Sequence, residues 1–158
     1  MRHGAALEGV AVVLGATALG AIVVHSGAGW AALVIAALSV PLVLADVRTR
    51  LLPNVLTVPI LMAGVAEAPG SVVAAATVAL ILGVLHSAGG LGMGDVKLGA
   101  GLAFPLAALG PDRMSAAVGL AFLLAGLWAL PLLLSGDRSR IAFGPFQLAA
   151  FWIVVAAG

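Results

Sequence analysis

Long apolar segments fill almost the whole chain and leave little of it for a water-facing surface. Of the 158 residues, 63% are hydrophobic and only 8% are charged, whereas soluble domains carry about 25% charged residues. So few charges cannot cover a soluble globule, and a disordered chain would need low hydrophobicity and high charge. The sequence therefore predicts an all-α membrane protein that crosses the lipid bilayer several times.

Turn residues and charges divide the chain into seven hydrophobic segments, each of which is a candidate helix. A spanning helix needs about 20 apolar residues, so seven spans nearly exhaust the chain. The third and fifth segments are too short to cross in full, which indicates local thinning or partial spans. The segments are residues 5–24, 30–45, 55–66, 71–86, 96–109, 114–134 and 141–157.

We expect a single membrane domain over residues 1–158, a transmembrane helix bundle of about seven spans. It comprises an extra N-terminal helix at about 5–24 and a six-helix core over about 30–157. The first segment could be mistaken for a cleaved signal peptide. It is long, however, and carries Glu8, so we expect it to be retained.

The basic residues collect on one side of the membrane if the N-terminus is cytoplasmic and the chain crosses seven times. Six of the seven then lie in the cytoplasm, which is the positive-inside pattern. This predicts a multi-pass membrane protein with its N-terminus inside and its C-terminus outside. The six residues are Arg2, Arg48, Arg50, Lys97, Arg138 and Arg140.

Residue types that several function classes need are missing or scattered. The chain has no cysteine, which excludes disulfides and cysteine metal sites. Its histidines, at positions 3, 25 and 86, lack the spacing of zinc ligands. Its few basic residues form no stripe that would bind nucleic acid. We therefore expect no metal, no cofactor and no nucleic-acid partner.

Ionisable residues near the membrane point to candidate chemistry, because an Asp at a helix centre costs about 2.5–3.5 kcal/mol on insertion scales. Glu67 precedes a Pro-Gly turn and is expected to be a solvated loop residue, while Glu8 fits the first turn of a helix. Asp46 ends the second segment and Asp95 opens the fifth. Two segments lie between these aspartates, so both are expected at the cytoplasmic boundary.

A glycine-rich stretch leads into Asp95. Glycine permits positive φ and close backbone approach, so this stretch predicts a loop that lies against an extended ligand and delivers Asp95 to the first turn of a helix. The pattern matches neither the Walker nor the dinucleotide-binding motif. The glycines are Gly89, Gly90, Gly92 and Gly94.

Two carboxyl groups held close together in a partly dry site tend to share one proton. The ionised group can then accept a proton from an attacking water, while the protonated group donates a hydrogen bond to the scissile carbonyl. Two other interpretations remain open from the chemistry alone. The aspartates could be boundary residues paired with Arg48 and Lys97, or they could belong to a proton or ion pathway.

Three short motifs surround these residues. They are Asp46, Arg48, Pro53 and Asn54, the run Gly92-Met93-Gly94-Asp95-Val96-Lys97-Leu98, and Phe143-Gly144-Pro145-Phe146. Together they resemble the type IV prepilin peptidases, the bacterial members of the Gly-x-Gly-Asp intramembrane aspartic proteases. The motifs cover much of the chain from about residue 40 onward.

The resemblance implies an endopeptidase that removes the basic leader from prepilins or pseudopilins at the cytoplasmic face of the membrane. Asp46 and Asp95 would be the catalytic pair. Other motif residues would shape the two loops: Arg48, Pro53 and Asn54 in the first, and Gly92, Gly94 and Lys97 in the second. The expected partners are the precursor proteins of a type IV pilus or secretion system and the lipid bilayer.

The chain also departs from this family. Many members carry an N-terminal domain with paired Cys-x-x-Cys motifs that is linked to methylation of the new N-terminus, and this chain has no cysteine. We therefore expect peptidase activity without methylation. Two alternatives remain: a small proton- or ion-coupled transporter that uses Asp46 or Asp95, and a pilus-assembly subunit that has lost activity.

Overall fold

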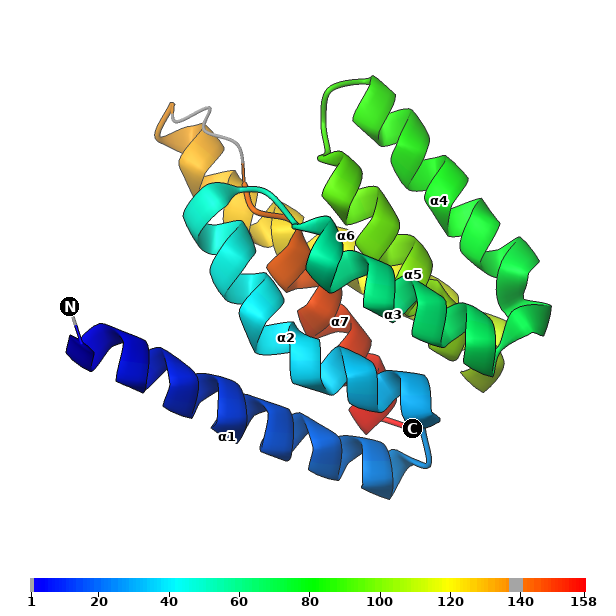
Figure 1. The fold of residues 1–158 in the computed structure, drawn as a ribbon. Helices are drawn as coiled ribbons and strands as arrows, with labels where there is room; N and C mark the ends of the chain where they lie inside the picture. Colours follow the sequence, from blue (N-terminus) through cyan, green and yellow to red (C-terminus); the bar gives the residue numbers. More distant parts are fainter. Residues whose placement is uncertain (1, 137–140) are drawn as a thin grey trace.

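The computed structural model describes residues 2–136 and 141–158, and these residues form seven α-helices and one short 3₁₀ turn (Figure 1). Each predicted segment coincides with most of one helix, so the predicted all-α bundle is confirmed. Arg138, Arg140 and the side chain of Arg2 lie outside what the structure describes. The elements are α1 (Arg2–Ser26), α2 (Trp30–Thr49), α3 (Asn54–Glu67), η1 (Pro69–Ser71), α4 (Val72–Ser87), α5 (Met93–Leu109), α6 (Pro111–Leu134) and α7 (Gly144–Ala156).

Four of the described segments are long and apolar enough to cross a membrane: most of α1, all of α2, η1 with α4, and α6. The other three helices, α3, α5 and α7, have 14, 17 and 13 residues. At about 1.5 Å per residue they reach about 20–26 Å, less than the hydrocarbon thickness of about 30 Å. The third and fifth segments are short as predicted, and the seventh is shorter than predicted because its helix begins only at Gly144.

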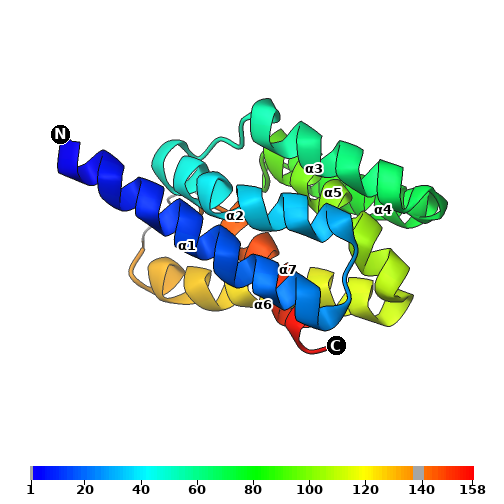
Figure 2. The same cartoon turned by 60° about the horizontal axis from the view of Figure 1, so that its bottom comes forward.

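The short helix α5 lies inside the bundle and is buried along most of its length. It packs against α3, α4, α6 and α7 (Figures 1 and 2). Small residues permit this close packing: a Cβ on Gly101 would lie 2.9 Å from Ile60 Cγ2 and 3.2 Å from the backbone of Leu61. Neighbouring helices therefore surround α5, which gives its polar first turn a protein environment in place of lipid.

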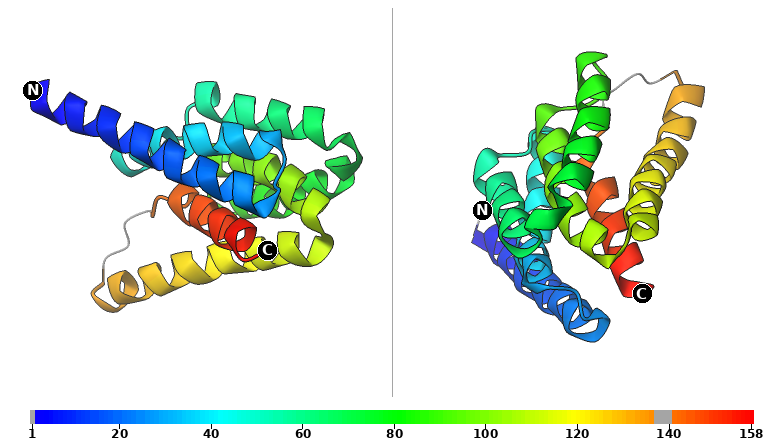
Figure 3. Two further views of the ribbon diagram at one scale, coloured as in Figure 1. Left: turned by 90° about the horizontal axis from the view of Figure 1, so that it is seen from below. Right: turned by 90° about the vertical axis from the view of Figure 1, so that its right-hand side faces the viewer.

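Helix α1 lies on the outside of the bundle, where it packs along α2 and contacts α7. Figure 3 shows α1 and α6 on opposite sides of the molecule. Most of the described side chains of α1 are exposed, as expected of a helix that faces lipid, and Val23 is its buried contact with the core.

The prediction that Glu67 is a solvated loop residue is wrong. It is the last residue of α3, and its carboxylate accepts a hydrogen bond from the backbone N–H of Ala31 in the first turn of α2. A carboxylate at a helix N-terminus satisfies an otherwise unpaired donor and interacts favourably with the helix dipole. Glu67 thus joins the α3 end of the bundle to the start of α2.

Candidate active site

Asp46 and Asp95 line one hollow. It lies where α2 ends and α5 and α7 begin, and Figure 1 shows these three helix ends at one end of the bundle. The hollow encloses about 420 Å³, including its open mouth. Both side chains are buried, with 3% of Asp46 and 8% of Asp95 exposed. The two helices between them, α3 and α4, therefore return the chain to the same end of the bundle.

Asp46 is held by α7. Its Oδ2 accepts a hydrogen bond of 2.9 Å from the backbone N–H of Gly144. A Cβ on Gly144 would lie 2.8 Å from that same oxygen and 3.3 Å from Leu52 Cδ1. The absence of a side chain at position 144 is therefore what lets the start of α7 approach the Asp46 carboxyl group.

Asp95 is held by its own helix. It lies in the first turn of α5, where Oδ2 accepts a hydrogen bond of 3.0 Å from the N–H of Gly92, the residue that precedes the helix. Its Oδ1 is buried and has no hydrogen-bond partner among the described residues. Since buried polar atoms are nearly always paired, this oxygen is a natural place for a water or substrate group.

The glycine before Asp95 allows close packing, as predicted, but its contact is another part of the protein. A Cβ on Gly94 would lie 2.6 Å from Leu52 Cβ and 3.2 Å from the Leu52 carbonyl oxygen. Leu52 thus fits against both Gly94 and Gly144. It fills the space between the loop after α2 and the first turns of α5 and α7.

Neither aspartate pairs with the cation that follows it in sequence. Arg48 forms an exposed ion pair with Glu8 of α1. Lys97 Nζ donates a hydrogen bond of 2.9 Å to Asn54 Oδ1. Within the described residues no salt bridge involves Asp46 or Asp95, so the interpretation of these residues as paired boundary charges is not supported.

The structure brings most of the expected site residues together and leaves one apart. Gly92 lines the hollow beside the two aspartates. Pro53 caps the N-terminus of α3, and the bond between Lys97 and Asn54 joins the first motif to the second. Arg48 was expected to shape the first loop, and it instead connects α2 to α1.

Three contacts of the site were not predicted from the sequence: those of Gly144, Leu52 and Gln147. Gln147 lies three residues after Gly144 on α7, and its Nε2 donates a hydrogen bond of 3.2 Å to the main-chain oxygen of Asp95. A possible signal was present, because Gln147 is the only glutamine of the chain and lies in an apolar run. Gly144 supplies a backbone N–H, and the identity of a residue does not indicate which partner its backbone N–H will bind.

The arrangement suits acid–base chemistry on water. Two buried carboxyl groups share one hollow, and one carboxyl oxygen has no partner among the residues that the structure describes. Such a pair can exchange a proton with a water and with a carbonyl oxygen placed between them. The described residues contain no group of three or more His, Cys, Asp or Glu side chains that could hold a metal ion.

Fold and site together define a multi-pass helical membrane protein with two buried carboxyl groups at one end of its bundle. A model of the type IV leader peptidase family matches residues 32–130, which is more than half of the chain. The chain therefore belongs to the type IV leader peptidase family and is a leader-peptidase-like membrane protease. No curated protein and no solved structure shows a significant match to it. The matched range contains both aspartates, whereas Gly144 and Gln147 lie beyond it.

Proposed function

We propose that the chain is an aspartic endopeptidase that removes the basic leader from type IV prepilins or pseudopilin-like precursors. Asp46 and Asp95 are the catalytic pair. The observation that carries this proposal is the hollow at the end of the bundle, which both carboxyl groups line while no cation of the described residues pairs with either. Membership of the leader peptidase family favours this function over proton or ion transport.

The proposed reaction is hydrolysis of one peptide bond. One aspartate, ionised, takes a proton from water as the water oxygen attacks the scissile carbonyl carbon. The other, protonated, donates its hydrogen to the carbonyl oxygen and stabilises the tetrahedral intermediate. When the intermediate collapses, the C–N bond breaks and the leaving nitrogen takes the proton that the first aspartate had accepted from water. One hydroxyl of the intermediate returns its proton to the second aspartate as the carbonyl re-forms, so both aspartates regain their starting states.

We place this reaction at the cytoplasmic face of the plasma membrane. Arg50 lines the same hollow as the aspartates, and Lys97 lies two residues after Asp95 on α5. Basic residues near a membrane end favour the cytoplasmic side. A precursor with a basic leader and an apolar segment presents its junction at this depth, because the apolar part lies in the bilayer and the leader does not.

The test is co-expression with candidate prepilins from the same genome, read by gel shift and by N-terminal sequencing of the product. We expect cleavage by the unsubstituted chain, and losses of at least about 100-fold in Asp46→Asn and in Asp95→Asn. Sequencing also checks the expectation that the new N-terminus is not methylated.

Asp112→Asn is the matched control, because Asp112 lies exposed at the start of α6, away from the hollow. It should cleave like the unsubstituted chain at equal expression. Normal cleavage by either Asp46→Asn or Asp95→Asn would rule out the catalytic pair. If the unsubstituted chain cleaves no candidate, a proton-flux assay in liposomes tests the transporter alternative.

A further inference from the structure

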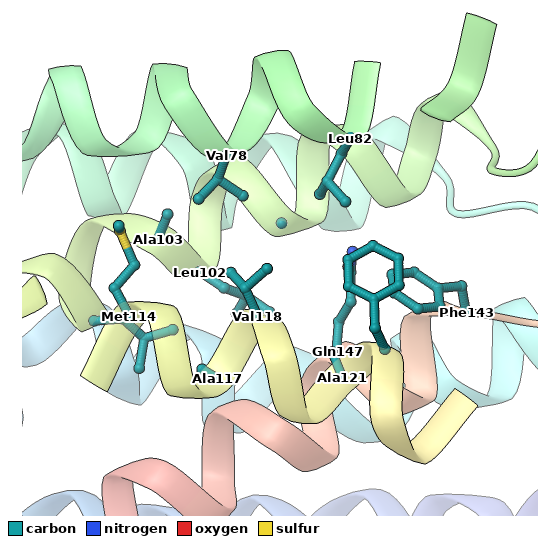
Figure 4. A pocket seen from close by; sticks show the side chains of 13 residues that line it. Val78, Leu82, Leu102, Ala103, Met114, Ala117, Val118, Ala121, Phe143 and Gln147 are labelled. Carbon is teal, nitrogen blue, oxygen red and sulfur yellow. The ribbon is translucent and has the colours of Figure 1, made fainter. Parts of the chain in front are cut away.

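Gln147 is a polar residue in an apolar part of the bundle. Only 6% of it is exposed. Figure 4 shows it at a pocket between α4, α5, α6 and α7, beside Phe143. Every other described residue that lines this pocket is apolar. A buried amide is unfavourable in such surroundings unless hydrogen bonds satisfy it.

Only half of the amide is satisfied. Because a carbonyl can only accept, the NH₂ group of Gln147 must face the main-chain oxygen of Asp95, at 3.2 Å. This leaves Gln147 Oε1 buried and without a partner among the described residues. An apolar side chain of similar shape would avoid that penalty. The stability of the fold therefore does not explain why an amide occupies this position.

The same turn of α7 also holds the other aspartate. Gly144 and Gln147 are three residues apart, so they lie on the same face of the helix. Gly144 binds the carboxyl group of Asp46 on α2, and Gln147 binds the backbone of Asp95 on α5. One helical turn thus connects the two helices that carry the aspartates.

We propose that Gln147 is a positioning residue, which fixes the first turn of α5 against α7 and thereby sets the separation of the Asp95 and Asp46 carboxyl groups. This inference rests on the proposed function. Gln147 acts through the backbone of Asp95 and does not line the hollow that the two carboxyl groups share. Gly99 leaves room for it, since a Cβ on Gly99 would lie 3.2 Å from Gln147 Nε2.

The first test compares Gln147→Met with the unsubstituted chain. Methionine keeps the length of the side chain and removes both the donor and the unpaired oxygen. We expect kcat to fall about tenfold or more at unchanged KM, because small displacements of catalytic groups slow the chemical step. The Tm should not fall. A lower Tm with unchanged kcat would show a purely structural role and overturn the inference.

Ser39→Ala is the matched control. Ser39 is also buried, and its Oγ accepts a hydrogen bond of 3.0 Å from Trp152 Nε1, which joins α2 to α7 away from the aspartates. Removal of this bond leaves a buried indole N–H unpaired. Ser39→Ala should therefore lower Tm and leave kcat unchanged, the opposite of Gln147→Met. An equal fall in kcat in both variants would overturn the inference.

A second measurement does not depend on cleavage. The chain has no cysteine, so spin labels can be attached through Val47→Cys and Met93→Cys, two exposed positions beside the aspartates. We expect the distribution of label distances to widen in Gln147→Met and to stay unchanged in Ser39→Ala. An unchanged distribution in Gln147→Met would overturn the inference. If no precursor is cleaved, the proposed function fails, and these distances still decide the role of Gln147.

Discussion

Lys97 donates a hydrogen bond to Asn54, and these two residues are the only lysine and the only asparagine of the chain. They lie 43 positions apart, at the starts of α5 and α3. The bond connects the helix that carries Asp95 to the segment that follows Asp46. It gives the two aspartate motifs a direct contact outside the hollow that they line.

This bond predicts coupled effects on activity. Lys97→Met and Asn54→Leu should each lower kcat/KM by about twofold to tenfold, the range expected for loss of one hydrogen bond. The kcat/KM of the double variant should be no lower than that of the less active single variant, because the bond can be lost only once. The measurement is a double-mutant cycle on precursor cleavage. Additive losses would show that the bond does not couple the motifs.

Gly144→Ala should slow cleavage by about tenfold to a hundredfold. The added Cβ would lie 2.8 Å from Asp46 Oδ2 and must displace either that carboxyl group or the start of α7. Gly119→Ala in α6 is the control, because a Cβ there meets nothing within 4 Å. Rates are compared at equal amounts of folded protein. Equal rates for the two variants would contradict the role given to Gly144.

Arg48→Gln tests a residue that the family resemblance assigns to the site. Arg48 is paired with Glu8 and exposed, and such surface ion pairs contribute little. We expect cleavage within about twofold of the unsubstituted chain. Arg48→Gln and Glu8→Gln should also behave alike. A loss in Arg48→Gln that Glu8→Gln lacks would show that Arg48 acts at the site independently of α1.

The topology is tested with reporter fusions at the two termini. The positive-inside pattern predicts a cytoplasmic N-terminus and an external C-terminus. A reporter active only outside the cytoplasm should therefore work at the C-terminus and fail at the N-terminus. A cytoplasmic C-terminus would make the number of crossings even, and one of the three short helices would then be the segment that does not cross.

Hydropathy predicted the seven helices well, because each apolar segment forms one helix and turns rich in glycine, proline or charged residues separate them. The Gly-x-Gly-Asp run likewise placed Asp95 in the first turn of α5. The positions of the helices and the placement of Asp95 can both be predicted because residues close together in the sequence determine them.

The remaining contacts depend on residues far apart in the chain. Gly144 contacts Asp46 across 98 positions through a backbone N–H, a group that every residue type except proline carries. Arg48 could pair with Asp46, two positions away, or with Glu8, 40 positions away, and the packing of α1 decides between them. The spacing of these residues along the sequence predicts neither contact, because both contacts follow from how the helices are arranged in three dimensions.

The contacts of α7 also set the order in which the site can come into being. The helices that carry Asp46 and Asp95 are synthesised before α7, which supplies Gly144 and Gln147 to them. Until α7 has docked, the contact of Gly144 with the Asp46 carboxyl group and that of Gln147 with the Asp95 backbone are missing. A chain in which α7 has not yet docked therefore carries both aspartates without these contacts, and the proposed hydrolytic centre is complete only once this helix is in place.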